Sequence, residues 1–222
     1  MKKEAMESTW NIALKELRPL AVVAAALMLI TTVIYPLAVT GIGQAAFGRQ
    51  ANGSILQMNG EAVGSSLIGQ TFAGAGYFQG RPSAAGAGYD ASSSSGSNLG
   101  PTSDKLINGV VDDPKTADVD ESFAGIKQRA ETYRTANGLA AGQTLPSDSV
   151  TASASGLDPH ISPANARLQI ERVATARSAT PADLRGLVDE YTEHAAFGFI
   201  GEPRVNVLKL NMALDRRFPA PK

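Results

Sequence analysis

A long apolar segment near the N-terminus dominates the hydropathy pattern of the chain. Residues 20–40 form a run of twenty-one positions without a charged side chain. A helix rises 1.5 Å per residue, so this run spans roughly 30 Å, the thickness of the hydrocarbon core of a membrane. Pro19 is expected in the first turn of this helix, and Pro36 is expected to kink or loosen its last turn. The pattern predicts a transmembrane helix over residues 20–40.

Two other interpretations of this segment stay open, a buried core helix and a cleaved signal peptide. So long an uncharged run is rare in soluble domains, and it exceeds the usual apolar region of a signal peptide. Four basic residues precede the run, whereas the first two that follow it are Arg49 and Arg81. The positive-inside rule therefore predicts a cytoplasmic N-terminus at residues 1–19 and a soluble extracytoplasmic domain at residues 41–222.

Hydrophobic periodicity beyond the span predicts a mixture of strands and helices. Asn59-Gly60, the pair most typical of a type I′ turn, predicts a β-hairpin over residues 54–68. Apolar spacings of three and four follow helix-start residues at Asp118 or Asp120, at Ser162 and at Thr180. Helices are predicted over residues 118–137, 162–176, 184–194 and 211–217, with a strand over residues 205–210. This irregular order indicates a single α+β domain.

A stretch rich in glycine, alanine and serine separates the hairpin from the first of these helices. Residues 84–97 are almost wholly Ala, Gly and Ser, a composition typical of a flexible linker. The stretch runs into Asn98, Gly100 and Pro101, whose backbone preferences fall in the order of a specified turn. Because long loops inside a domain are usually disordered or functional, this loop is a candidate functional element.

Charge and composition exclude several classes of protein. Twenty basic and twenty-one acidic residues give a formal charge of −1, which argues against a nucleic-acid partner. The chain has no cysteine and only two histidines, His160 and His194, so thiolate chemistry and a multi-histidine metal site have no basis. Gly-Lys never occurs, which removes the phosphate-binding loop of nucleotide-binding folds. We therefore expect this chain to bind no metal and no cofactor of its own.

Two alternatives from other functional classes stay open. Ser97 or Ser155 could act as a nucleophile with His160 as its base in a membrane-anchored extracytoplasmic hydrolase. Ser97, however, lacks the flanking sequence of a nucleophile elbow. The chain could also be a free-standing ligand-binding domain on a membrane stalk.

Several separate motifs stand in the order typical of one protein family. They are Leu17-Arg18-Pro19, Gln50-Ala51-Asn52-Gly53-Ser54, Leu67-Ile68-Gly69-Gln70, Gly76-Tyr77-Phe78, Gly80-Arg81-Pro82-Ser83, Ser95-Gly96-Ser97-Asn98-Leu99, residues 150–158, Val205-Asn206 and residues 210–215. On these motifs, which run from Leu17 to Asp215, the chain resembles the KdpC family. That family is the small subunit of the potassium-importing P-type ATPase known as Kdp.

The resemblance implies an accessory subunit of an ATP-driven potassium import complex in the bacterial cytoplasmic membrane. Its implied partners are a channel-like potassium-binding subunit, an ATP-hydrolysing P-type subunit and a very small single-span subunit. The family is described as a catalytic chaperone that raises ATP affinity through a transient ternary complex, with the ATP on the hydrolysing partner. The predicted topology puts most of this chain on the side opposite cytoplasmic ATP. We therefore expect coupling through the membrane-embedded partners.

The loops within these motifs supply the candidate partner contacts. We expect residues 81–83 and 95–101 to fold against the core and to present a rigid surface to the potassium-binding partner, the alternative being purely structural turns. Residues 151–158 have been likened in the family to the nucleotide-sensing signature of ABC transporters, and a strand-to-helix turn braced by Asp158 explains them as well. The candidate residues are Arg81, Pro82, Ser83, Ser97, Asn98, Gly100, Ser155, Gly156, Asp158 and Asn206.

Overall fold

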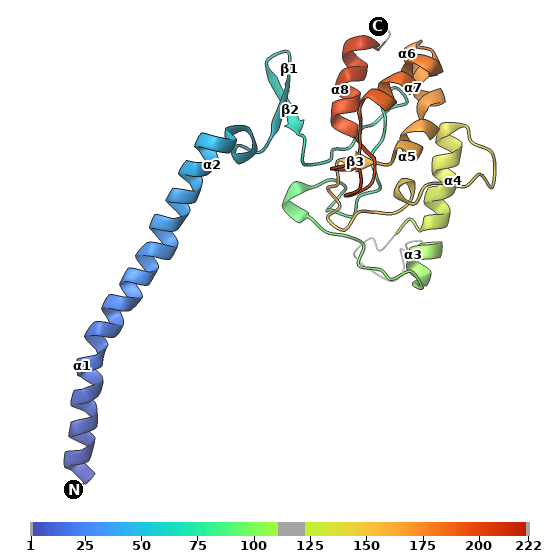
Figure 1. Cartoon of the computed structure of the whole chain (residues 1–222). Helices are drawn as coiled ribbons and strands as arrows, with labels where there is room; N and C mark the ends of the chain where they lie inside the picture. Colours follow the sequence, from blue (N-terminus) through green and yellow to red (C-terminus); the bar gives the residue numbers. More distant parts are fainter. Residues whose placement is uncertain (1, 111–122, 221–222) are drawn as a thin grey trace. The chain divides into compact units, whose positions relative to one another are not determined.

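The computed structural model describes residues 2–110 and 123–220 of the chain. The chain divides into two compact units, Met1–Ser54 and Ile55–Lys222. The first unit is a long helix, and the second is a domain of short strands and helices (Figure 1). The predicted α+β class with one long apolar N-terminal helix is therefore confirmed.

The first unit consists of α1 (Lys2–Met28), the π-helical segment η1 (Leu29–Ile34) and α2 (Tyr35–Ala51). Within it, Leu14–Ala51 is long and apolar enough to cross a membrane, and its most apolar 18 residues have a mean hydropathy of 2.3. The helix extends beyond both ends of the predicted segment, so Pro19 lies inside α1 and not in a first turn. Apolar patterning missed these ends because the flanking Lys, Glu and Ala residues are themselves good helix formers.

The helix changes its turn geometry just before Pro36. Proline has no N–H to donate to the carbonyl four residues earlier, and its ring crowds that carbonyl. The backbone widens there into η1, where the Tyr35 N–H donates to the Ile30 carbonyl. The hydroxyls of Thr31 and Thr32 donate to the carbonyls four residues before them, at 2.7 and 2.5 Å. The predicted distortion at Pro36 is present, but it lies within the helix and not in its last turn.

The second unit begins with an antiparallel hairpin of β1 (Ile55–Met58) and β2 (Glu61–Ser65). The turn residues Asn59-Gly60 have φ values of 54° and 85°, as a type I′ turn requires. The predicted hairpin is confirmed, although its second strand ends at residue 65 and not at residue 68. After it, the side-chain amide of Gln70 donates to a β2 carbonyl at 2.9 Å and ties the next segment to the hairpin.

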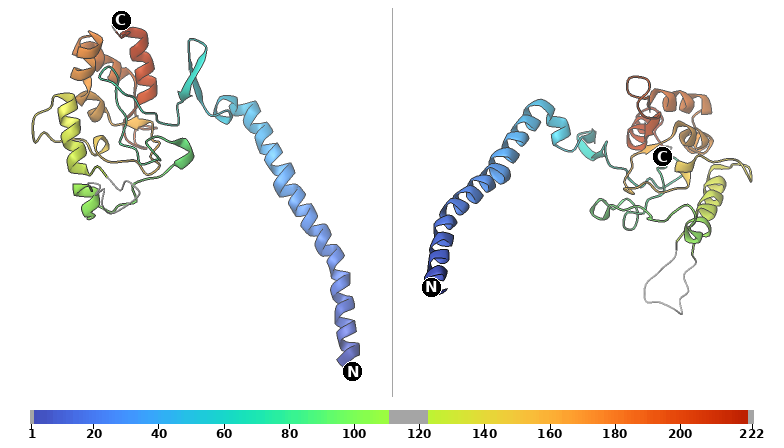
Figure 2. Two further views of the ribbon diagram at one scale, coloured as in Figure 1. Left: turned by 180° about the vertical axis from the view of Figure 1, so that it is seen from behind. Right: turned by 60° about the horizontal axis from the view of Figure 1, so that its bottom comes forward.

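Short strands and a group of helices make up the rest of this domain. Its described helices are α3 (Asp104–Asn108), α4 (Ile126–Asn137), α5 (Pro163–Leu168), α6 (Ile170–Arg177), α7 (Pro181–Glu190) and α8 (Val207–Arg217), with 3₁₀ turns η2 (Ala91–Ser93) and η3 (Ser147–Ser149). The strand β5 (Arg204–Asn206) pairs antiparallel with β3 (His160–Ile161) on one edge and with β4 (Thr192–Glu193) on the other. Helices α5 to α8 lie together in every view of the domain (Figures 1 and 2).

The hydrophobic core lies between these helices and the three-stranded sheet. Its largest buried side chains are Phe78, Ile161, Ile170, Val173, Leu184, Leu187, Val188, Val205, Leu210 and Leu214. Burying one such side chain contributes about 1.5–3 kcal/mol relative to leaving it exposed. Phe78 is unusual among them because it comes from a segment outside any helix or strand, residues 76–83. This segment carries several of the candidate residues into the domain.

The helix predicted over residues 118–137 is shorter in the structure. It begins only at Ile126. Phe123, which shared its apolar spacing, instead forms an isolated antiparallel bridge with Val110. The backbone groups of Phe123 are used in that bridge, so a helix cannot include them. The predicted caps Asp118 and Asp120 lie outside the described residues.

Two further helices begin where the sequence predicts them but differ in extent. Ser162 and Thr180 each accept a hydrogen bond from the backbone N–H three residues later, as N-caps do. The helix after Ser162 is divided at Gln169 into α5 and α6. The helix after Thr180 ends at Glu190, short of the predicted residue 194, because residues 192–193 pair with β5.

The alternation over residues 205–210 predicts a strand, and this is wrong beyond Asn206. The Asn206 Oδ1 accepts the N–H of Lys209 at 3.1 Å and so caps α8, which begins at Val207. Its Nδ2 donates to the Ser66 carbonyl at 2.8 Å. The buried Asn206 side chain therefore ends β5, starts α8 and holds the chain that leaves the hairpin.

Candidate functional site

Residues 76–83 cross the domain as an extended segment that pairs with side chains in place of a neighbouring strand. The Phe78 N–H donates to Asn211 Oδ1 at 2.9 Å, and Asn211 Nδ2 donates to the Phe78 carbonyl at 2.8 Å. Gln169 makes the same pair of hydrogen bonds with the backbone of Gln79, at 2.7 and 3.1 Å. Two side-chain amides, one on α8 and one between α5 and α6, thus satisfy backbone groups that would otherwise lack partners.

Two arginines hold the start of this segment. Arg172 Nη1 donates to the carbonyls of Ala75 and Tyr77 at 2.7 and 3.0 Å. Arg177, which is almost fully buried, donates from Nε to the Gly76 carbonyl at 2.7 Å and stacks over the Tyr77 ring. Its Nη2 lies 2.8 Å from the Asp215 carboxylate. None of these positioning groups was predicted, although polar residues at apolar positions of the α6 and α8 patterns were an available signal.

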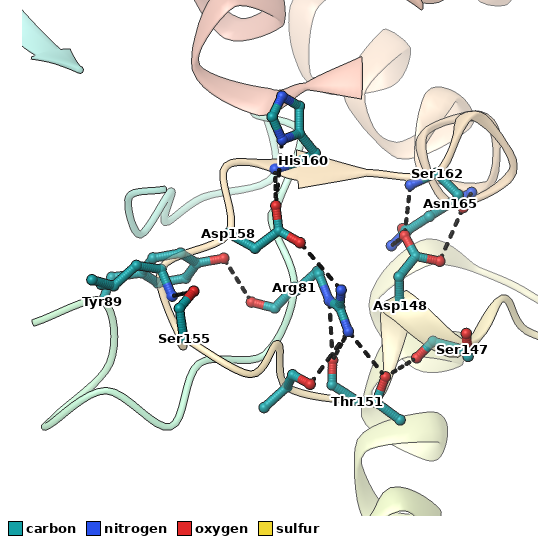
Figure 3. A network of polar contacts seen from close by, with 12 residues as sticks. Arg81, Tyr89, Ser147, Asp148, Thr151, Ser155, Asp158, His160, Ser162 and Asn165 are labelled. Carbon is teal, nitrogen blue, oxygen red and sulfur yellow. Dashed lines mark hydrogen bonds and ion pairs between the residues drawn. The ribbon is translucent and has the colours of Figure 1, made fainter. Parts of the chain in front are cut away.

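Arg81 joins the extended segment to the loop that precedes β3. Its Nη1 contacts Asp158 Oδ2 at 3.2 Å. Its Nε and Nη2 donate to the Thr151 carbonyl at 3.4 Å, and Nη2 also reaches the Ala152 carbonyl at 3.3 Å. Figure 3 shows the guanidinium between the Asp158 carboxylate and this turn. Two predicted candidates, Arg81 and Asp158, therefore lie together as a bracket between distant segments.

Asp158 is also held from its other side. Its Oδ1 accepts the backbone N–H of His160 at 3.0 Å, and the His160 Nδ1 lies 3.4 Å from the same oxygen. Burial raises the pKa of Asp158, but the hydrogen bonds from His160 and the charge of Arg81 outweigh it, so the pKa lies below its usual value. The carboxylate is therefore ionised at neutral pH and serves as the fixed acceptor of the network.

Ser83 fixes the start of the loop that was predicted to be either a linker or an ordered element. Its Oγ donates to the Gly156 carbonyl at 2.7 Å and accepts the N–H groups of Ala85 and Tyr89 at 3.2 and 2.8 Å. The Tyr89 hydroxyl donates to the Arg81 carbonyl at 2.8 Å, and burial raises its pKa to about 12. The loop is thus tied to the rest of the site at both backbone and side-chain level.

Gly156 allows two loops to lie in direct contact. It has φ +67°, and a Cβ placed on it would lie 2.5 Å from the Ser95 carbonyl oxygen and 2.8 Å from the Ala85 nitrogen. Ser155 contributes its carbonyl to the Ser94 hydroxyl at 2.9 Å, while its own Oγ accepts the Leu157 N–H at 3.1 Å. These residues join η3 to β3, so the predicted strand-to-helix turn is wrong in its direction.

The remaining candidates lie nearer the surface. Asn98 is exposed, with φ +52°, and Ser97 beside it is half-buried. Gly100 is exposed, and its carbonyl accepts the Ser103 N–H at 3.0 Å just before α3. Pro82 lines a largely apolar cavity of about 360 Å³. Asn98 and Gly100 are therefore displayed to solvent and Ser97 and Pro82 are half-buried, whereas Arg81, Ser83, Gly156, Asp158 and Asn206 brace the loops from within.

A polar groove of about 660 Å³ opens beside the bracket. It is lined by Arg81, Asp148, Asp158, His160, Ser162 and Arg204, among others. Asp148 accepts two hydrogen bonds from Ser162, at 2.7 and 2.9 Å, and one from Asn165 at 3.0 Å (Figure 3). The described part of the chain contains no group of three or more acidic or histidine residues placed to hold a metal ion.

The geometry around His160 bears on the hydrolase alternative. Its ring faces two carboxylates, Asp158 at 3.4 Å and Glu193 at 4.0 Å. Glu193 is in turn engaged by Lys209 at 2.8 Å and by Arg204 at 3.2 Å, and the Lys209 hydrogen bond holds its pKa below the usual value. Ser155 uses its hydroxyl within its own turn. The arrangement orients side chains and loops; among the described residues it does not join Ser155 to His160.

Comparison with known proteins identifies the family of this chain. The family model for KdpC, "K+-transporting ATPase, c chain", matches residues 17–216. A protein of Caulobacter vibrioides named "Potassium-transporting ATPase KdpC subunit" is 50% identical over 207 residues, which is 93% of this chain and 95% of that protein. Proteins of the same name from Mycobacterium tuberculosis and Koribacter versatilis are 46% and 47% identical, covering 91% and 85% of this chain and 98% and 88% of their own lengths. The chain therefore belongs to the KdpC family of potassium-transporting ATPase subunits.

Proposed function

We propose that this chain is a non-catalytic accessory subunit of an ATP-driven potassium import complex. It is needed for assembly and stability of the complex, and it raises the ATP affinity or turnover of the subunit that hydrolyses ATP. The observation that carries this proposal is family membership over almost the whole chain. The candidate site supports it, because its charged and polar groups are engaged in bracing loops against one another.

The membrane topology follows from the charge pattern. The helix over Leu14–Ala51 supplies one span of the bacterial cytoplasmic membrane. Four basic residues precede residues 20–40, so the N-terminus lies in the cytoplasm and the domain from residue 41 onward lies outside. Most of the chain is then separated from cytoplasmic ATP by the bilayer.

Its partners are a channel-like potassium-binding subunit, the ATP-hydrolysing P-type subunit and a small single-span subunit. We assign contact with the potassium-binding subunit to residues 97–100, in particular to the half-buried Ser97 and the exposed Asn98 and Gly100. Arg81 and Asp158 are positioning residues, because their hydrogen bonds hold the loops that carry this surface. A rigid loop loses little conformational freedom on binding, which favours a stable docking surface.

The effect on ATP travels through the membrane-embedded partners. ATP binds the hydrolysing subunit, and this chain binds no cofactor of its own. Stabilising one conformation of the partners from outside raises ATP affinity inside only if that conformation is the one that binds ATP better. The same coupling requires ATP to strengthen the association of this chain with its partners.

Affinity purification tests the proposal directly. A tag after Lys222 is used to extract the full chain in gentle detergent, and co-purifying proteins are identified. Potassium-stimulated ATPase activity and its dependence on ATP concentration are measured with and without this chain. We expect a large P-type ATPase and a polytopic channel-like protein to co-purify, and activity or ATP affinity to fall when the chain is omitted.

Two results would contradict the proposal. A chain that is extracted alone is not a subunit, and an ATPase whose rate and ATP dependence ignore this chain has no need of it. Labelling of the folded chain by a serine-reactive fluorophosphonate, abolished by Ser155→Ala or Ser97→Ala, would instead establish the hydrolase alternative.

A further inference from the structure

The link between β4 and β5 carries the most exposed aromatic side chains described in the domain. Phe197 and Phe199 are 89% and 79% exposed, and Ile200 beside them is also exposed. We name residues 195–201 the aromatic loop. It contains no charged residue. Large apolar side chains displayed together in this way mark interaction sites, whereas single exposed apolar residues are ordinary.

The backbone of the aromatic loop is built to hold this display. Ala196 and Ile200 exchange two hydrogen bonds of 2.9 Å, and the Gly198 N–H donates to the Ala195 carbonyl at 3.1 Å. Phe197 has φ +54°, a conformation that is uncommon for a bulky aromatic residue. The loop is a closed turn on paired strands, so both rings are presented in a defined arrangement and not on a loose tether.

We propose that the aromatic loop is a docking anchor that inserts Phe197 and Phe199 into an apolar pocket of another protein subunit of the same complex. The proposal rests on the proposed function, since it needs a partner subunit on the side of the domain. Aromatic side chains, phenylalanine among them, are enriched at protein interfaces, and preorganisation lowers the entropy lost when they dock.

The charges around the loop favour a protein pocket over a lipid surface. Segments that lie in a membrane interface combine apolar residues with an excess of Lys and Arg that attracts anionic lipids. Here the residue that follows the loop is the acidic Glu202, and the next cation on the β5 side, Arg204, is paired with Glu193 at 3.2 Å. A fluid bilayer also gains nothing from the fixed backbone of Phe197, whereas a shaped pocket does.

Truncation of the two rings tests the anchor. The full-length tagged chain is titrated against the partner subunits purified without it, and half-maximal capture is measured for the wild type and for Phe197→Ala/Phe199→Ala. Leu67→Ala is the matched control, because Leu67 is an apolar side chain of the same domain that is 63% exposed. We expect the double variant to need at least about 30-fold more chain, as loss of an interface hot spot does, and the control to bind like the wild type.

A fluorescent probe distinguishes the possible occupants. The chain has one tryptophan, Trp10, so Trp10→Phe/Phe199→Trp places a single indole in the loop. Its emission is recorded for the full chain alone in lipid nanodiscs at two chain-to-disc ratios, and again with the partner subunits. We expect a blue shift only when the partners are added.

Each other outcome overturns the proposal. A blue shift in nanodiscs without partners assigns the loop to lipid, and a shift that grows with the number of chains per disc assigns it to a second copy. Equal capture of wild type and double variant, with both equally folded by thermal unfolding, shows that the loop is not an anchor although the chain is a subunit. Failure of the wild type itself to be captured contradicts the proposed function and not only the anchor.

Discussion

Replacing Asn211 by leucine should destabilise the domain, because it removes the side-chain amide that pairs with the Phe78 backbone as a neighbouring strand would. Asn211 is 1% exposed and makes two hydrogen bonds with the backbone of Phe78, which is itself fully buried. Leucine fills a similar volume but has no polar atom. The substitution therefore leaves one buried N–H and one buried carbonyl of Phe78 without partners.

The size of the effect follows from these two groups. A buried donor or acceptor left unsatisfied costs about 1–3 kcal/mol, which gives about 2–6 kcal/mol for the pair. The leucine side chain returns about 1–2 kcal/mol of apolar burial. Taking the middle of each range, about 4 kcal/mol less about 1.5 kcal/mol, the net loss is about 2.5 kcal/mol, or roughly 5–10 °C in the melting temperature for a domain of this size.

Urea and thermal unfolding of the full chain in detergent measure this loss. Four of the five tyrosines lie in residues 55–222, so near-ultraviolet circular dichroism at the tyrosine band reports on the domain. Arg216→Leu makes the same change to leucine at an exposed position of α8 and should shift stability by less than about 0.5 kcal/mol. If Asn211→Leu unfolds with the same midpoint as Arg216→Leu, the amide is not needed as a strand substitute and the reasoning fails.

Three further predictions concern the bracket and its supports. Gly156→Ala should lower the free energy of unfolding by about 3 kcal/mol or more, because the new Cβ at φ +67° meets backbone atoms. Gly142→Ala, at φ +81° in open space, should lower it by only about 1–2 kcal/mol, and thermal unfolding measures both. The pKa of Asp158 is lower in the folded chain than its unfolded value of about 4, so the stability that its charge contributes is present above that pH and is lost as the pH falls through the folded pKa. Asp158→Asn should therefore be less stable than the wild type at pH 7 and should lose less stability on acidification, as measured by unfolding from pH 7 to pH 2. Arg177→Met should cost about 2–4 kcal/mol in urea unfolding, because the half-buried Gly76 carbonyl and the partly exposed Asp215 carboxylate lose the guanidinium.

The contradicting results are equally specific. Glycine variants with the same melting temperature would mean that the two loops at Gly156 are free to separate. An asparagine variant with the acid unfolding profile of the wild type would mean that Asp158 titrates alike in the folded and unfolded chain. A loss below about 1 kcal/mol for Arg177→Met would mean that water or a neighbouring side chain replaces the guanidinium.

Features that depend on neighbouring residues could be predicted well. The hairpin was placed correctly because Asn59-Gly60 prefers positive φ angles whatever surrounds it. The helix starts at Ser162 and Thr180 were placed correctly because an N-cap needs only its own hydroxyl and an N–H three residues later. Helix ends were less predictable, since the bridge between Phe123 and Val110 lies outside any local pattern.

The candidate site was predictable in its members but not in their roles. Arg81 and Asp158 were both singled out by motif, yet their contact joins residues 77 positions apart. Gln169, which helps to hold the extended segment, was not singled out, and Asn211 appeared only within the motif at residues 210–215 and was given no role. Their partners lie 90 and 133 positions away in the chain, so no spacing within the sequence relates them.

The sequence by itself determined the apolar helix, the class of the domain, the turns and the family, because each depends on local composition or on a linear order of motifs. Only the tertiary structure decided that residues 205–210 divide into strand and helix, that residues 84–97 are held by Ser83 and Gly156, and that two phenylalanines face solvent. The reason is physical: alternating apolar residues fit either element, and a small-residue loop is ordered only if distant groups satisfy its backbone. Burial is likewise a property of the folded packing and not of the residue type.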